Sequence, residues 1–170
     1  MSRPKAVTFK GNPMTLAGEE LQVGADAPDF TLHYFKDGFQ TLTKADLAGK
    51  KSLISVVPSL DTGVCAIQTK TFNEKVAGLG DSVNAVTVSL DLPFAQGRFC
   101  GAEGIENMQT ASDYQDRNFG NSFGVLIEEL KLLTRAVFVL DGSGKVIHAE
   151  IVPEVTDEPN YDSAFGALSS

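Results

Sequence analysis

The two cysteines are the residues of this chain best suited to covalent chemistry. Cys65 lies in the stretch PSLDTGVCA, and Cys100 lies in the later stretch DLPFAQGRFC. A thiolate is the reactive form of cysteine, and the sulfenic acid that it gives on oxidation condenses readily with a second thiol. Two thiols allow one disulfide, and in a reducing compartment such a bond usually cycles rather than persists. The alternative is that both are small buried hydrophobes, the commonest role of a free cysteine.

The segments around Cys65 place its thiol at the start of a helix. The apolar run from Leu53 to Val57 predicts a buried strand, and VCAIQTKTFNEKVAGLG predicts a helix that begins next to Cys65. The free N–H groups of a first helical turn and the positive end of the helix dipole favour an anion there. The dipole contributes at most ~2 kcal/mol, so a nearby cation is also expected.

Arg135 is the first candidate for that cation. It stands in the strand-forming run TRAVFVLD, where successive side chains face opposite sides of a sheet. An arginine among such neighbours must either reach solvent or meet an anion. Arg98 is the second candidate.

Two further residues of the Cys65 stretch fit a reactive site. Thr62 lies three residues before Cys65, so in a helical turn its hydroxyl faces the same side and can donate to a thiolate or to a bound oxygen. Pro58 follows the strand and could shield the sulfur from bulk water. The structural alternatives are that Thr62 or Asp61 only caps the helix and that Pro58 only ends the strand.

The pattern along the chain predicts one α/β domain over residues 1–170, with a thioredoxin-like arrangement: a central mixed sheet flanked by helices and preceded by an N-terminal β-hairpin. The expected elements are a hairpin over 6–23, strands on either side of a turn at 36–38, a short helical piece after Thr43, strands over 52–57 and 84–91, helices over 64–80, 94–100 and 112–119, a hairpin over 134–152, and a last helix from about 159.

Composition narrows the classes of partner. Hydrophobic residues make up 42% and charged residues 21%, and no apolar run approaches the ~20 residues of a membrane span. The net charge of −8 disfavours nucleic acid, whose phosphates need clustered Lys and Arg. The N-terminal MSRPKAVTFKGNP lacks the apolar region of a secretory signal, so a cytoplasmic protein is expected.

These residues also carry a resemblance. Pro58, Thr62 and Cys65 match the P-x-x-x-T-x-x-C signature of peroxiredoxins. The longer stretches PSLDTGVCA and DLPFAQGRFCGAEGIEN resemble the bacterial thiol peroxidases, the atypical two-cysteine branch of that family. VTFKGNP, APDFTL, TRAVFVLD and DEPNYDSAFGAL extend the similarity over nearly the whole chain.

The resemblance implies a thioredoxin fold, usually homodimeric, that reduces hydrogen peroxide and organic hydroperoxides at the expense of thioredoxin, without cofactor or metal. By motif, Cys65 is the peroxidatic cysteine, Cys100 is the resolving cysteine, and Pro58, Thr62 and Arg135 complete the pocket. One segment departs from the family pattern: LIEELKLLTR is more charged and poorer in glycine than expected, and Thr134 stands where a small alanine is usual.

Other functions fit the sequence less well. A thioredoxin-type reductant would have C-x-x-C, but Ala66, Ile67 and Gln68 follow Cys65. A cysteine hydrolase needs a histidine base, and both His33 and His148 are expected to be structural or solvent-facing. The acids between 150 and 162 lack the spacing of a calcium loop. The remaining rival is a non-catalytic thioredoxin-like domain with two inert thiols.

Overall fold

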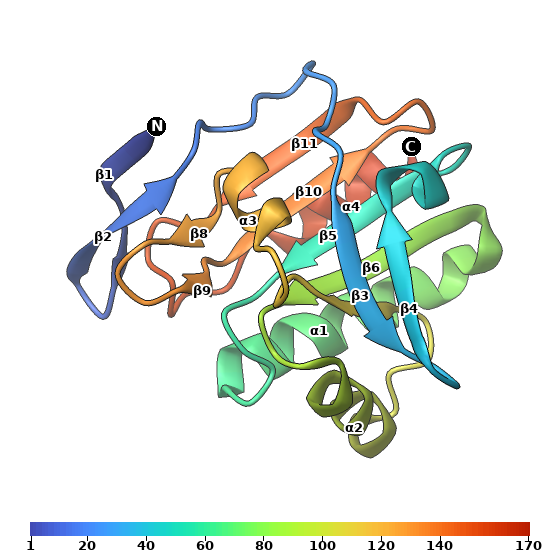
Figure 1. Cartoon of the computed structure of the whole chain (residues 1–170). Helices are drawn as coiled ribbons and strands as arrows, with labels where there is room; N and C mark the ends of the chain where they lie inside the picture. The colour runs from blue at the N-terminus through green and yellow to red at the C-terminus, as the bar shows by residue number, and fades with distance from the viewer.

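A seven-stranded mixed sheet runs through the middle of the molecule (Figure 1). The computed structural model describes residues 1–170. In spatial order the strands are β11 (Val146–Ile151), β10 (Ala136–Leu140), β5 (Lys51–Val56), β6 (Val83–Ser89), β7 (Gln109–Ser112), β3 (Thr31–Phe35) and β4 (Phe39–Thr43). Strands β5, β6 and β7 are parallel, and the others pair antiparallel. The predicted central mixed sheet is confirmed.

Alternation along the central strands divides the core between the two faces of the sheet. On β10, Val137 and Val139 join one hydrophobic cluster, whereas the residues between and beside them join the other. Leu53 of β5 faces the same side as Val137. Because side chains alternate with a period of two, Arg135 and Ser55 also face this side of the sheet.

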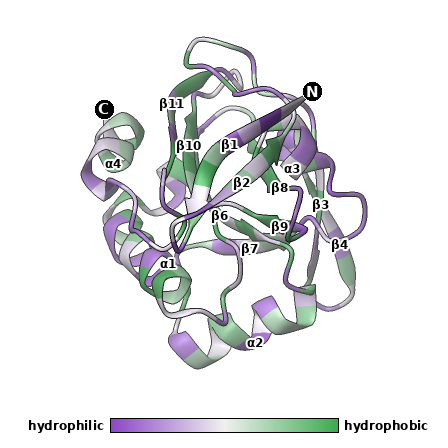
Figure 2. Cartoon of the chain, turned by 90° about the vertical axis from the view of Figure 1, so that its left-hand side faces the viewer, coloured by the Kyte–Doolittle hydropathy of each residue, from purple (hydrophilic) through white to green (hydrophobic).

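The helices cover both faces. They are α1 (Gly63–Val76), α2 (Pro93–Glu103), α3 (Asn118–Ser122) and α4 (Tyr161–Ser169), with 3-10 turns η1 (Lys44–Leu47) and η2 (Ala77–Ser82). Helices α1 and α4 cover the face that holds Val137, and Phe119 of α3 and Phe123 directly after it lie in the cluster on the opposite face. Helix α2 packs against β7 and β3. In Figure 2 the hydrophobic colour is strongest along strands such as β10, whereas the helices and loops around them are of mixed colour.

The N-terminal hairpin belongs to a second, smaller sheet. Strands β1 (Ser2–Phe9) and β2 (Asn12–Ala17) pair antiparallel, as predicted, and β2 continues to β8 (Leu126–Ile127) and β9 (Leu132–Leu133). The acids of the unusual LIEELKLLTR segment lie here. Glu128 accepts from the Ser2 hydroxyl, and Glu129 accepts from the Thr15 backbone and hydroxyl at 2.8 and 2.9 Å. The added charges therefore fasten this segment to the hairpin.

One predicted element is wrong. Residues 112–119 do not form a helix, because β7 extends to Ser112 and α3 begins only at Asn118. The buried Asp113 carboxylate accepts from the N–H groups of Phe119 and Gly120 at 3.1 and 2.7 Å. These bonds hold the start of α3, and Arg117 before it has a positive φ of 51°, which separates the helix from the preceding turn.

Candidate active site

Cys65 lies in the first turn of α1 and its residue is fully buried. Thr62 is the residue before the helix, in an extended conformation with φ −106°, and the helix starts at Gly63. The sulfur lies at the edge of a small cluster with Val57 and Leu60, and Phe99 packs against that cluster. The predicted position at a strand-to-helix junction is therefore correct.

The Arg135 side chain lies on the face of the sheet predicted by strand alternation, and it contacts the Cys65 sulfur. Its residue is 2% exposed, and Nη2 donates to Cys65 Sγ at 3.4 Å. The other two nitrogens donate to neutral oxygens: Nε to the Val155 carbonyl at 2.8 Å and Nη1 to Gln68 Oε1 at 2.9 Å. No carboxylate forms a salt bridge with this guanidinium. Cys65 Sγ is therefore the one atom among these three contacts that can become an anion.

Gln68 is a site residue that the sequence reasoning missed. It is fully buried one turn after Cys65, and while it accepts from Arg135 it donates from Nε2 to Ser55 Oγ at 2.8 Å. This pair of bonds fixes the amide and therefore the guanidinium. The available signal was its position three residues after Cys65, which places both on one helix face.

The buried face of α1 is not the face that its apolar residues predict. Ile67 belongs to the apolar set that predicts the helix, yet it is 48% exposed. The buried face follows Cys65, Gln68 and Phe72 instead. Among the buried polar groups of this face, Gln68 is the one that holds the arginine.

Cys100 lies on α2 and is half-buried. Its sulfur is 3.6 Å from the Thr110 hydroxyl, and it lines a cavity of about 360 Å³ together with Tyr34, Pro93 and Met108. Burial raises the pKa of the Cys100 thiol, against a smaller opposite effect of the Thr110 hydrogen bond. Cys100 is therefore held as a neutral thiol at neutral pH, whereas Cys65 faces a cation.

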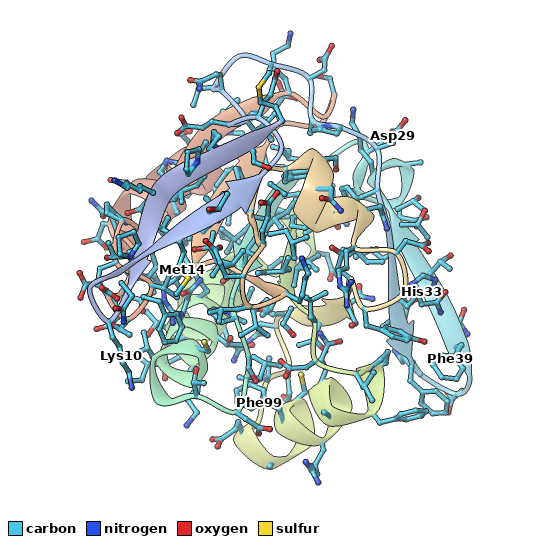
Figure 3. The ribbon with its side chains drawn as sticks, turned by 60° about the vertical axis from the view of Figure 1, so that its left-hand side comes forward. Lys10, Met14, Asp29, His33, Phe39 and Phe99 are labelled. Atoms are coloured by element: carbon cyan, nitrogen blue, oxygen red, sulfur yellow. The ribbon has the colours of Figure 1, made fainter.

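Helices α1 and α2 lie side by side and bring the two cysteine segments close (Figure 1). Lys70 of α1 pairs with Glu103 of α2 at 2.7 Å, and the Asn73 side chain accepts from the Asn107 backbone at 2.8 Å. Phe99, labelled on α2 in Figure 3, packs both against the Cys65 cluster and against the cluster that the adjacent Cys100 contacts. Both thiols are free.

The other predicted residues are placed as follows. Thr62 is exposed, and its hydroxyl donates to the Ser59 carbonyl at 3.0 Å rather than to the sulfur. Pro58 is buried directly after β5. Arg98 is exposed and lines a surface hollow with Leu92 and Phe94, so it is not the cation beside Cys65. The roles of Thr62 and Pro58 towards a peroxide stay predictions.

The histidines take no part in this site. His148 lies on β11, half-buried rather than solvent-facing, and burial lowers its pKa. Its Nε2 and the Nδ1 of His33 are enclosed without a hydrogen-bond partner. Neither lies among the groups that contact Cys65.

Comparisons with known proteins agree with this geometry. The Redoxin family model matches residues 22–165. The chain belongs to the Redoxin family. It is 54% identical over 164 residues to the thiol peroxidase of Bacillus subtilis (strain 168), covering 96% of each chain, and 51% identical over 165 residues to that of Halalkalibacterium halodurans, covering 97% of this chain and 98% of the other.

Solved structures place this member of the Redoxin family among the peroxiredoxins. A peroxiredoxin-like protein from Aquifex aeolicus superposes with a TM-score of 0.89 at 43% identity, covering 97% of this chain and 96% of that one. A thiol peroxidase from Chromobacterium violaceum, at 18% identity, shares the fold with a TM-score of 0.85, covering 96% and 94% of the two chains. The expected thioredoxin-like fold is confirmed, and the chain is a peroxidase of the peroxiredoxin type. No helix of this peroxidase is both long enough and apolar enough to cross a membrane.

Proposed function

We propose that this chain reduces hydrogen peroxide and organic hydroperoxides, with Cys65 as the peroxidatic cysteine, Cys100 as the resolving cysteine and thioredoxin as the reductant. The contact between Arg135 Nη2 and Cys65 Sγ at 3.4 Å is the observation that carries the proposal. A buried guanidinium with no carboxylate partner stabilises the attacking thiolate and the hydroxide or alkoxide that departs from the peroxide.

The first step oxidises Cys65. Its thiolate attacks one peroxide oxygen, an S–O bond forms as the O–O bond breaks, and the sulfur becomes a sulfenic acid. The peroxide is reduced, and its departing oxygen takes up a proton to give water or an alcohol. Since Cys65 is fully buried, the surrounding groups must shift to admit the peroxide. The Thr62 hydroxyl would turn from Ser59 to donate to the bound oxygen, with Pro58 keeping out bulk water.

The second step uses Cys100. Its sulfur attacks the sulfenic sulfur, an S–S bond forms as the S–O bond breaks, and water leaves with the Cys100 proton. A dithiol protein then reduces this bond and becomes a disulfide itself, which regenerates both thiols. Thioredoxin as that protein and a homodimeric assembly follow from the family resemblance, and both fit a protein that works in the reducing cytoplasm.

A single-turnover experiment tests the proposal. Reduced protein is mixed with an equimolar amount of cumene hydroperoxide, quenched with an alkylating agent, and analysed by intact and peptide mass. We expect both free thiols to disappear together within seconds and a peptide linked through Cys65 and Cys100 to appear.

Two variants separate the roles of the cysteines. Cys65→Ser should consume no peroxide, whereas Cys100→Ser should turn over once and stop as a sulfenic acid. If both cysteines of the natural protein are still fully alkylated after minutes, the rival with inert thiols is correct. Recycling of the oxidised protein with thioredoxin and its reductase is the next measurement.

A further inference from the structure

The Asp91 carboxylate lies between the two cysteine-bearing segments and binds groups from both sides. It follows β6, which ends at Ser89. Its Oδ1 accepts from the Ser59 hydroxyl at 2.8 Å, and its Oδ2 accepts from the Leu60 N–H at 2.8 Å. Both donors belong to the loop that leads into Cys65, so one carboxylate holds that loop at two points.

The same carboxylate reaches α2 through one intermediate. The fully buried Ser89 hydroxyl donates to Asp91 Oδ2 at 2.7 Å and accepts from Gln96 Nε2 at 3.0 Å. Gln96, 1% exposed, lies one turn before Cys100 and also donates to the Ala111 carbonyl of β7 at 3.0 Å. This chain of hydrogen bonds therefore joins the Cys65 loop, the end of β6 and the first half of α2.

We infer that Asp91 is a positioning residue that holds the protein in the state that attacks peroxide and delays the state that forms the disulfide. This inference rests on the proposed roles of Cys65 and Cys100. In the structure Cys65 faces Arg135, while Cys100 packs in a different cluster. The first step needs the Asp91 bonds, because they fix the loop before Cys65. The second step needs the two segments to loosen.

The inference predicts opposite effects on the two steps. In Asp91→Asn the side chain keeps its shape but offers an amide donor where the natural carboxylate accepts, so at least one of its three acceptor contacts is lost. We expect oxidation of Cys65 to slow and disulfide formation to accelerate, each by roughly five- to thirty-fold, as follows from losing charge-assisted bonds. The fraction of Cys65 over-oxidised to sulfinic acid in excess peroxide should fall.

The experiment measures the two steps separately. The first rate is read on a Cys100→Ser background, from the loss of the Cys65 thiol after quenching with N-ethylmaleimide. The second rate is measured in the protein that keeps both cysteines, from the appearance of the peptide linked through Cys65 and Cys100. Asp81→Asn is the matched control, since Asp81 is exposed and its side chain makes no hydrogen bond. Urea unfolding of each reduced variant reports its stability.

Each outcome is decisive. If both rates fall in Asp91→Asn, Asp91 has only a structural role. If both rates equal those of Asp81→Asn, Asp91 has no role in either step. Either result overturns the inference. If Asp91→Asn does not fold, Ser59→Ala removes one of the donors and should shift the rates in the same directions. If the natural protein itself forms no linked peptide, the proposed function has failed instead.

Discussion

Arg135 is the residue on which the chemistry of Cys65 depends most directly. Its fork-shaped guanidinium makes three donations in three directions, to Val155, Gln68 and the sulfur. Lysine carries the same charge on a compact ammonium and does not reproduce this planar arrangement. A substitution that keeps the charge therefore separates geometry from electrostatics.

For Arg135→Lys we expect Cys65 oxidation to slow by about 10² to 10³, the usual effect of losing one preorganised donor at a reacting oxygen. The rate is measured by quenching with N-ethylmaleimide at a series of hydroperoxide concentrations. Arg98→Lys is the matched control and should react like the natural protein, because Arg98 is exposed on α2. An Arg135→Lys variant of unchanged rate would show that the guanidinium only stabilises the fold.

Sequence reasoning reached Arg135 and both cysteines but not Gln68. Arg135 could be predicted because a cation in an alternating apolar strand must either reach solvent or contact an anion. In the structure it contacts the Cys65 sulfur, which can form an anion. A glutamine in a helix is ordinarily a surface residue, and nothing in its type marks it as buried. Its second partner is Ser55, which the folded sheet places against α1.

At the scale of elements, α3 depends on a buried carboxylate. Burial raises the pKa of Asp113 to about 6, although the N–H groups of Gly120 and Phe119 act in the opposite direction. In the unfolded chain the pKa of an aspartate is about 3.9. The folded protein therefore binds this proton more tightly, and the stabilising contribution of the protonated form is complete below about pH 4 and lost as the pH rises through 6.

Asp113→Asn should consequently change how stability depends on pH. Between about pH 4 and 7 the natural protein should lose up to about 3 kcal/mol relative to the variant, which has no group to titrate there. Urea unfolding at several pH values, followed by circular dichroism, measures the difference. Asp81→Asn serves as the control, since Asp81 is exposed and its side chain makes no hydrogen bond. Parallel curves for the natural protein and Asp113→Asn would show that Asp113 does not titrate in this range.

The short elements explain what the sequence pattern could not reveal. Strands β8 and β9 have two residues each, so they carry no measurable alternation. Strand β8 pairs with β2 and β9, and the Glu128 and Glu129 contacts to the hairpin lie beside that pairing. The long elements were predictable because β5, β6 and β10 are apolar on both sides. The hydrogen bonds that position α3 are accepted by Asp113 in the preceding loop. No local sequence pattern identifies the N–H groups that it binds.

At the scale of the whole molecule, the disulfide should change α2 and leave the sheet intact. Three of the strands, β5, β6 and β10, lie in the middle of a seven-stranded sheet and are buried on both faces. Helix α2, in contrast, contains Gly97 and Gly101, which lower helix stability by roughly 1 kcal/mol each relative to alanine. The helix that carries Cys100 is therefore less stable than it would be with alanine at these two positions.

We expect amide hydrogen exchange over residues 93–103 to be faster in the oxidised than in the reduced protein, with the central strands equally protected in both. Mass spectrometry of peptides after timed deuteration measures this. Cys100→Ser treated with equimolar peroxide should keep the slow exchange of the reduced state. Faster exchange throughout the sheet would mean that the disulfide loosens the whole fold.

Phe99 and Cys100 are consecutive residues, and this adjacency governs which thiols reach the oxidised sulfur. Phe99 packs against the cluster that contains Cys65 and, like Cys100, against the larger cluster that contains Phe72, so we expect a shift of α2 that displaces the ring to move Cys100 as well. We expect this one movement both to uncover the Cys65 sulfenic acid and to bring the Cys100 thiol towards it. Small thiols from solution have little opportunity to intercept it, and mixed disulfides on Cys65 should accumulate only in a chain that lacks Cys100.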